Sequence, residues 1–323
     1  MRLLALLGSP LSSTVIRRLS DGPTPLIELR RASGSPAQTT LRAHLKELDD
    51  IGAIARRRRD AFPGVIECEL TPAGTELLSV ADALERWLQE APEGPLAFGS
   101  SDAKAAIKAL MDGWASTMLR ALAARPLSLT ELDSIIEGLS YPSLERRLGA
   151  LRLTGQIEAC TGNGKGTPYK PTEWLRRATA PLAAAARWER RHILDDSSST
   201  TRADTETSFL LSLPLVRLPA ELSGSCRMGV ETNADQERRL AGVIADVQKG
   251  RIASCTVRLN GSASAWVIGS ATAWLHAVVD LDLDGLELGG DRRLARGVVD
   301  GLHAALFKRS RARATPKLAS TSA

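Results

Sequence analysis

No stretch of this 323-residue chain approaches the roughly 20 consecutive apolar residues that a membrane-spanning helix needs. The apolar start, residues 3–7, stops at Gly8-Ser9-Pro10. It is too short for the hydrophobic part of a signal peptide, and no cleavage site follows. These absences predict a cytoplasmic protein without a membrane partner.

Cysteine is scarce, and the four cysteines lie far apart in the sequence: Cys68, Cys160, Cys226 and Cys255. There is no Cys-X-X-Cys pair, and no histidine flanks a cysteine at the spacing of a zinc site. We therefore expect free thiols instead of disulfides, and no metal site.

Catalytic patterns are missing as well. The four histidines are scattered, and no nucleophile elbow, Walker-type loop or His-Glu-X-X-His motif occurs. The glycine-rich segment 162–166 lacks the Ser or Thr that follows the lysine of a phosphate-binding loop. The acidic segment 280–284 lacks the glycine and the terminal glutamate of a calcium loop. We expect no catalytic residue, no cofactor and no enzymatic activity.

The net charge of +5 is distributed unevenly along the chain. The last 17 residues carry five basic and no acidic side chains: Lys308, Arg309, Arg311, Arg313 and Lys317. Overall basicity is therefore a weak sign of nucleic-acid binding, and what matters is whether positive side chains gather on one surface.

The sequence contains an internal repeat. Residues 14–54 recur without insertion at a constant offset of 103 residues. The matched pairs include Leu19 with Leu122, Leu26 with Leu129, Leu41 with Leu144, Leu48 with Leu151 and Gly52 with Gly155. A repeat of this length indicates a duplicated domain.

The first copy has helical periodicity followed by β alternation. Residues 15–19 predict a helix that ends at Asp21-Gly22-Pro23, and residues 26–31 predict a second helix that ends at Ser33-Gly34-Ser35. Pro36 suits the first turn of a third helix. In this helix the leucines Leu41, Leu45 and Leu48 face inward, and the expected outward residues are Gln38, Thr39, Arg42, His44 and Lys46.

A basic hairpin follows the third helix. Residues 53–59 and 65–70 predict two strands around the turn Phe62-Pro63-Gly64, and the first strand carries Arg56, Arg57, Arg58 and Arg59. Thr71-Pro72 then suits the N-cap and first position of a longer helix. This order is that of a winged helix-turn-helix, whose third helix enters the DNA major groove while the hairpin reaches the adjacent backbone.

The second copy has the same order. Its third helix opens at Ser140-Tyr141-Pro142-Ser143, with Arg146 and Arg147 expected outward, and its hairpin tip at 162–166 is shorter and less basic. The side chains that we expect at DNA are therefore Gln38, Thr39, Arg42, Arg56, Arg57, Arg58, Arg59, Ser143, Arg146, Arg147 and Lys165.

Residues 4–90 resemble the HxlR-type winged-helix regulators of bacteria. The resemblance rests on Ile27-Glu28-Leu29-Arg30-Arg31, on Leu45-Lys46-Glu47-Leu48, on Glu69-Leu70-Thr71-Pro72-Ala73-Gly74 and on Leu84-Glu85-Arg86-Trp87. The second copy follows more loosely, with Tyr169-Lys170-Pro171-Thr172 and Trp188. The resemblance implies transcription regulators that bind operators as homodimers. The N-terminal cysteine that many members carry is missing from both copies, so we expect no redox switch.

Two alternatives stay open for the DNA contacts. The four arginines would also suit a solvated hairpin edge. Glu145 lies beside Arg146 and would be repelled by phosphate, so the second copy can instead serve mainly as a pseudo-dimer partner.

Beyond the polar segment 195–207 the pattern changes to α+β. Strands are expected at 226–231, 253–259, 263–268 and 285–288, and helices at 235–247, 271–279 and 291–307. Ala265-Trp266-Val267-Ile268-Gly269-Ser270 and Gly285-Leu286-Glu287-Leu288-Gly289-Gly290-Asp291 resemble sterol-carrier-protein-type domains. The resemblance implies an apolar ligand cavity between sheet and helices, with Trp266 or Trp274 in its wall. Both tryptophans would equally suit an ordinary core.

The predicted fold class is multi-domain, with two mainly-α winged helix-turn-helix domains followed by an α+β sterol-carrier-like domain. The predicted boundaries are 1–95, 96–194, a linker at 195–207, a ligand-binding domain at 208–307 and a basic disordered tail at 308–323. The predicted function is transcription regulation on double-stranded DNA, under control of a hydrophobic small molecule. We expect a monomer with an internal pseudo-dimer, or a homodimer.

Two other functions remain open. The chain could sequester a small molecule with winged helices that no longer bind DNA, or its C-terminal domain could serve only for dimerisation. The operator sequence, the effector and the choice between activator and repressor do not follow from the sequence.

Overall fold

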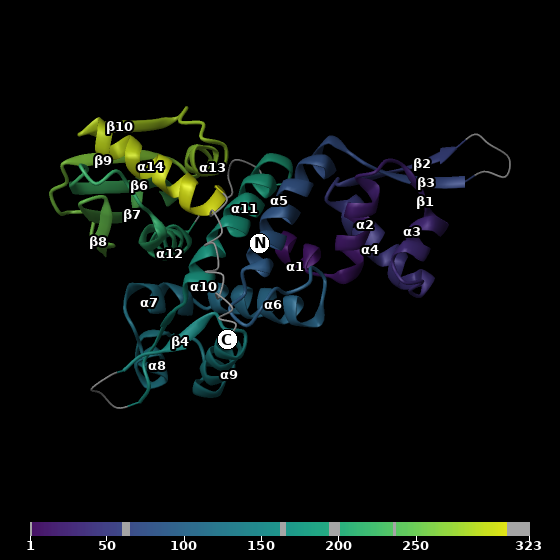
Figure 1. Ribbon diagram of the computed structural model, residues 1–323, viewed down its shortest axis with the longest axis horizontal. Helices are drawn as coiled ribbons and strands as arrows, with labels where there is room; N and C mark the ends of the chain where they lie inside the picture. The colour runs from purple at the N-terminus through teal and green to yellow at the C-terminus, as the bar shows by residue number, and fades with distance from the viewer. Residues whose placement is uncertain (1, 60–64, 162–165, 194–200, 235–236, 309–323) are drawn as a thin grey trace, which may run out of the picture.

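The computed structural model describes residues 2–59, 65–161, 166–193, 201–234 and 237–308 (Figure 1). Within these ranges, no helix is both long enough and apolar enough to cross a membrane. The hairpin turn at 62–64, Lys165, and the tail residues Arg309, Arg311, Arg313 and Lys317 lie outside the described residues.

The first unit comprises residues 2–89. Its elements are α1 (Arg2–Leu7), α2 (Pro10–Leu19), β1 (Thr24–Pro25), α3 (Leu26–Ala32), α4 (Gln38–Asp50), β2 (Ile54–Arg59), β3 (Val65–Leu70) and α5 (Pro72–Gln89). The expected helices and the hairpin are present, and a short strand, β1, joins the sheet in the order β1-β3-β2. The third helix, α4, begins two residues after Pro36, at Gln38.

Local sequence explains why α4 and α5 stand where they do. Leu41, Leu45 and Leu48 recur at helical spacing and are all buried, so one face of α4 packs into the core. Thr71 caps α5, since its hydroxyl accepts a hydrogen bond from the Gly74 amide at 3.0 Å. A Cβ atom at Gly74 would lie 1.9 Å from the Ala53 carbonyl oxygen, so this close approach of α5 to the hairpin requires glycine.

The second unit comprises residues 101–192. Its elements are α6 (Ser101–Ala115), α7 (Met118–Ala124), α8 (Leu129–Ile135), α9 (Tyr141–Leu153), β4 (Ile157–Ala159), β5 (Tyr169–Pro171), α10 (Glu173–Arg177) and α11 (Thr179–His192). Helices α8 and α9 begin and end 103 residues after α3 and α4, and β4 begins 103 residues after β2. The sequence repeat therefore corresponds to a repeat of secondary structure.

After the hairpins, the offset between the units falls to 101 residues because the second hairpin is two residues shorter. The bridge between Thr24 and Cys68 is matched by one between Leu127 and Tyr169. Thr71, which caps α5, corresponds to Thr172, which caps α10. On this offset the helix α5 corresponds to α10 and α11 together.

Helices α5 and α11 pack against each other at the centre of the two-unit body, and the hairpins β2–β3 and β4–β5 lie toward opposite ends (Figure 1). Trp87 on α5 donates its indole N–H to the Trp174 carbonyl at 2.9 Å, and Trp188 on α11 donates to the Ala73 carbonyl at 2.8 Å. These two hydrogen bonds join equivalent positions, since Trp188 and Trp174 lie 101 residues after Trp87 and Ala73. The contact between the units is thus locally reciprocal.

The C-terminal unit is a mixed five-stranded sheet in the order β10-β9-β6-β7-β8 with helices packed on it. Its elements are α12 (Arg202–Ser212), the 3₁₀ helix η1 (Leu213–Leu215), β6 (Gly224–Ala234), β7 (Glu237–Gln248), β8 (Arg251–Thr256), β9 (Ala265–Ser270), α13 (Ala271–Asp280), β10 (Leu286–Gly290) and α14 (Arg292–Phe307). One hydrophobic core lies in this unit, and another is shared by the first two units and also holds Leu211 of α12.

Two sequence predictions for this region are wrong. The helix expected at 235–247 is the strand β7, which pairs antiparallel with β6 from Gly224↔Val247 onward. One face of β7 is buried and carries Ala241, Val243, Ala245 and Val247. This is the period-2 pattern of a strand, but the apolar Ile244 between them obscured it in the sequence. The expected linker 195–207 is too long, because α12 begins at Arg202 with Thr201 as its N-cap.

Candidate DNA-binding surface and ligand cavity

Helix α4 presents a polar face to solvent. Gln38, Thr39 and Arg42 are all exposed, on the side away from the buried leucine stripe. Side chains in this position of a winged helix are free to approach the edges of bases.

His44 does not belong to that face, contrary to the prediction. It is half-buried, and its Nδ1 lies 3.0 Å from the Ser12 hydroxyl on α2. Position 44 follows Leu41 by three residues and precedes Leu48 by four, which places it beside the buried stripe.

The first hairpin has the predicted arginines, and their charges are partly balanced by acidic neighbours. Arg56 lies 3.5 Å from Asp49, and Arg57, which is 77% exposed, lies 2.7 Å from Glu69. Arg58 is also exposed, and Arg59 ends strand β2. Exposed pairs of this kind contribute little to stability, so the arginines can turn to phosphate at small cost.

In the second unit, helix α9 matches only part of the prediction. Glu145 and Arg146 are exposed, whereas Arg147 is half-buried and donates to the Asp112 carbonyl of α6 at 3.2 Å. Arg147 corresponds to His44 and, like it, lies beside the leucine stripe. Ser143 is half-buried, and its hydroxyl accepts a hydrogen bond from Ser140 at 3.1 Å. The exposed surface of α9 is therefore less basic than predicted.

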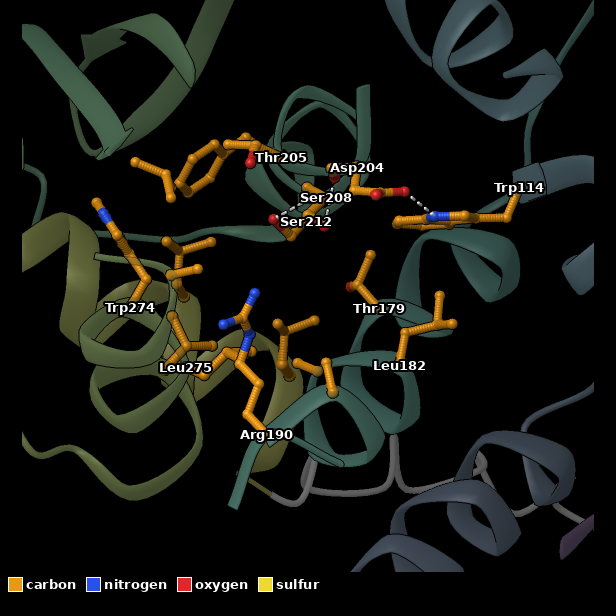
Figure 2. A pocket seen from close by; sticks show the side chains of 18 of the residues that line it. Trp114, Thr179, Leu182, Arg190, Asp204, Thr205, Ser208, Ser212, Trp274 and Leu275 are labelled. Atoms are coloured by element: carbon orange, nitrogen blue, oxygen red, sulfur yellow. Dashed lines mark hydrogen bonds between the residues drawn. The ribbon is translucent and has the colours of Figure 1, made fainter. Parts of the chain in front are cut away.

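A cavity of about 340 Å³ lies between the second unit and the C-terminal unit (Figure 2). Its walls come from α11, α12, α13 and α14, and Trp114 of α6 lies at one end. Trp274 lines it. Trp266 does not, because it lies on the opposite face of the sheet, where a Cβ atom at Gly289 would be 2.1 Å from its ring. The cavity is thus formed by two units and not within the C-terminal unit alone.

The wall formed by α12 is rich in hydroxyl groups. Thr205, Ser208 and Ser212 lie along one face of this helix, and Thr179 of α11 is nearby (Figure 2). Three of the hydroxyls donate to main-chain carbonyls: Ser208 to Asp204 at 2.9 Å, Ser212 to Ser208 at 2.7 Å and Thr179 to Arg176 at 2.7 Å. The Thr205 oxygen is buried and has no hydrogen-bond partner among the described residues.

A buried carboxylate holds α12 against the second unit. Glu206 is fully buried and forms ion pairs with Arg120 of α7 and with Arg202. The Arg120 Nε and Arg202 Nε atoms each lie 2.6 Å from a Glu206 oxygen. This contact was not predicted, because Arg120, Arg202 and Glu206 belong to no motif, and Arg202 and Glu206 stand in the expected linker.

Residues 6–94 match the family model of the HxlR-like helix-turn-helix. The match begins within α1, covers the rest of the first unit and ends before α6. No curated protein shows significant similarity to the chain. Residues 6–94 therefore form one HxlR-like helix-turn-helix domain.

Proposed function

We propose that this protein is a DNA-binding transcriptional regulator whose activity responds to a small molecule. The observation that carries the DNA-binding part is the HxlR-like domain at residues 6–94, with Gln38, Thr39 and Arg42 exposed on α4 and exposed arginines on β2. Helix residues would contact bases, and hairpin arginines would contact phosphates.

The second unit is proposed to be a second winged helix and to act as the internal partner of the first. Two observations support this: the secondary structure repeats, with an offset of 103 residues up to the hairpins and 101 residues after them, and the tryptophan hydrogen bonds between α5 and α11 are reciprocal. One polypeptide would then supply both halves of a dimer. Because α9 exposes Glu145 and buries part of Arg147, the two halves would contact DNA unequally, and we expect an asymmetric site.

Ligand control is proposed to act through the cavity. Helix α11 contributes one wall of the cavity and also packs on α5 of the HxlR-like domain. A ligand in the cavity would therefore contact the helix through which the second unit packs on the first. A ligand changes DNA affinity only if it binds the DNA-competent arrangement with a different affinity.

Fluorescence anisotropy with labelled duplex from the region upstream of the coding sequence tests the DNA-binding part. The combined change of Arg56, Arg57 and Arg58 to Ala should weaken binding and reduce the slope of log affinity against log salt by up to about three. A matched control changes three exposed arginines of the C-terminal unit to Ala: Arg251, Arg258 and Arg293. Equal losses in both variants, or no binding by the unaltered protein at low salt, would refute the proposal.

A second candidate is sequestration of a small molecule by a protein that no longer binds DNA. The observation that favours it is that a helix of the second unit forms part of the cavity wall. Tight ligand binding by a protein that shifts no DNA at low salt would support this candidate over the regulator.

A further inference from the structure

The cavity-lining face of α11 differs in charge from the equivalent face of α5. Three pairs of positions correspond at the offset of 101 residues: Asp82 with Ala183, Glu85 with Ala186 and Gln89 with Arg190. All three residues of α11 line the cavity. Two acids and a neutral amide on α5 thus correspond to two methyl groups and a cation on α11.

The two units bind equivalent arginines with acids from different helices. In the first unit, Asp82 and Glu85 of α5 bind Arg17 of α2, both with N···O distances of 2.6 Å. Arg120 corresponds to Arg17 at the offset of 103 residues, and it binds Glu206 of α12. Because Arg120 has its acid on α12, helix α11 needs none. Its face can therefore carry alanines, which leave space for a ligand.

Three aromatic side chains line the cavity: Trp114, Phe209 and Trp274. Phe209 and Trp274 meet edge to face, with ring centroids 5.0 Å apart. The indole N–H of Trp114 donates to Asp204 at 2.7 Å, and that of Trp274 donates to the Gly229 carbonyl at 2.8 Å, so both indoles offer ring surface to a ligand. Such rings favour stacking and edge contacts with a planar aromatic molecule. The cavity volume of about 340 Å³ lies near the lower end of the range for small-molecule pockets, which favours a compact ligand.

Arg190 supplies the positive charge of the cavity. It is half-buried, and it alone is basic among the described residues that line the cavity. Figure 2 shows its guanidinium extending from α11 into the space that the walls enclose. Arg190 already takes part in an interaction within the chain, but a guanidinium has five N–H donors and can bind more than one acceptor. Its planar fork matches a carboxylate, which accepts two parallel hydrogen bonds.

The two carboxylates of the lining are held by the chain itself. Glu189 is 8% exposed, and its Oε1 accepts a hydrogen bond from the Leu3 amide at 3.1 Å. Asp204 accepts from the Trp114 indole through Oδ1 and from the Thr201 hydroxyl, at 2.6 Å, through Oδ2. The acids are therefore bound to the walls, whereas the guanidinium extends into the cavity. This arrangement favours an anionic group on the ligand.

We propose that this cavity binds a compact aromatic carboxylate, with its rings among Trp114, Phe209 and Trp274 and its carboxylate on Arg190. This inference rests on the proposed ligand-binding role of the cavity and names the class of ligand. The carboxylate would be held by α11, the helix that packs on α5 of the HxlR-like domain.

Isothermal titration of the full chain with three naphthalene probes tests the proposal. The probes 2-naphthoate, 2-naphthamide and 2-naphthylmethylammonium share one ring system and differ in the charge of the substituent. The unaltered protein should bind 2-naphthoate about ten-fold more tightly than 2-naphthamide, the size expected for a hydrogen bond to a charged group, and should bind the ammonium probe most weakly. Equal affinity for 2-naphthoate and 2-naphthamide, or tightest binding of the ammonium probe, would show that the cavity does not select an anion.

A variant of Arg190 assigns the preference to this side chain. Arg190→Gln introduces the residue that α5 carries at the equivalent position. It should abolish the preference for 2-naphthoate and leave the affinity for 2-naphthamide unchanged, which also shows that the variant is folded. Arg293→Gln is the matched control, since Arg293 is exposed, lies outside the cavity lining and loses the same charge, and it should keep the preference. Equal losses in both variants would mean that the overall charge of the protein, and not Arg190, selects the anion.

The results separate this inference from the proposed function. If none of the probes binds, or if binding shows no preference for the anion, the ligand class is wrong, even when the protein binds DNA. If the preference for 2-naphthoate depends on Arg190 but 2-naphthoate leaves DNA affinity unchanged, the inference holds and the proposed control of DNA binding fails.

Discussion

Glu76 and Arg191 lie 3.4 Å apart across the contact between α5 and α11, and the equivalent pair, Glu90 and Arg177, lies 3.0 Å apart. Glu76 corresponds to Arg177, and Glu90 corresponds to Arg191, so at both equivalent positions the first unit is acidic and the second is basic. Pairing of a first unit with another first unit would bring Glu against Glu, and pairing of two second units would bring Arg against Arg. The charges therefore favour contact between unlike units.

This charge pattern predicts a double-mutant result. Glu76→Arg places two arginines together and should destabilise the protein by roughly 0.5–1 kcal/mol, more at 20 mM than at 500 mM salt. Adding Arg191→Glu restores an opposite pair and should recover most of the loss. Thermal unfolding measures both, with Glu93→Arg, on an exposed residue outside these pairs, as control. Strictly additive effects of the two changes would contradict the charge argument.

The buried carboxylate of α12 predicts a local effect. Glu206→Gln should lower stability by about 1–3 kcal/mol, because Arg120 and Arg202 lose a fully buried acceptor that carries a full charge. Hydrogen exchange should rise in residues 202–212 before it rises in the sheet. The exposed acid Glu221 offers a matched Glu→Gln control. Unchanged exchange in α12 would show that Glu206 does not hold this helix in place.

The unpartnered hydroxyl of Thr205 predicts an unusual stability change. In the absence of ligand, Thr205→Val should leave the free energy of unfolding unchanged or raise it by about 1 kcal/mol, since it removes a buried polar group without a partner. Thr207→Val should instead destabilise, because the Thr207 hydroxyl donates to the Ala203 carbonyl at 2.6 Å. Chemical denaturation compares the two, and a larger loss for Thr205→Val would mean that its hydroxyl has a partner in solution.

Three of the four free cysteines, Cys68, Cys226 and Cys255, should be poorly reactive. Burial raises the pKa of Cys226 and of Cys255 to about 12, and it raises the pKa of Cys68. A raised thiol pKa means that little thiolate, the reactive form, exists at pH 8. Alkylation by iodoacetamide, followed by peptide mass spectrometry, should stay slow at Cys226 and Cys255 between pH 7 and pH 9. Rapid labelling of either residue in the folded protein would contradict this prediction and would favour a thiol switch.

The two exposed helix faces predict unequal contributions to DNA binding. Arg42→Ala on α4 should reduce affinity for the upstream DNA by about 1–3 kcal/mol if it contacts a base. Arg146→Ala on α9 should have a smaller effect, because Glu145 lies beside it and Arg147 is held by α6. Anisotropy titrations at one salt concentration compare them, and equal losses would argue for a symmetric operator.

Sequence alone determined the parts of the fold that depend on local pattern. The leucines of α4 and α9, the breaker Asp21-Gly22-Pro23 and the capping Thr71 act over a few residues, so α3, α4 and the first hairpin were predicted with small errors at their ends. Helix α2 begins five residues earlier than predicted, and α1 was not predicted. The exposed Gln38, Thr39 and Arg42 followed from the same helical period.

Tertiary structure decided what depends on distant partners. Residues 237–248 form a strand because β6 pairs with them, and His44 and Arg147 turn inward because α2 and α6 provide their hydrogen bonds. The cavity needs side chains from Trp114 to Leu306, which local periodicity cannot bring together. Pairing, burial and ion pairs such as Arg120 with Glu206 are long-range contacts, and only the folded chain determines which of them form.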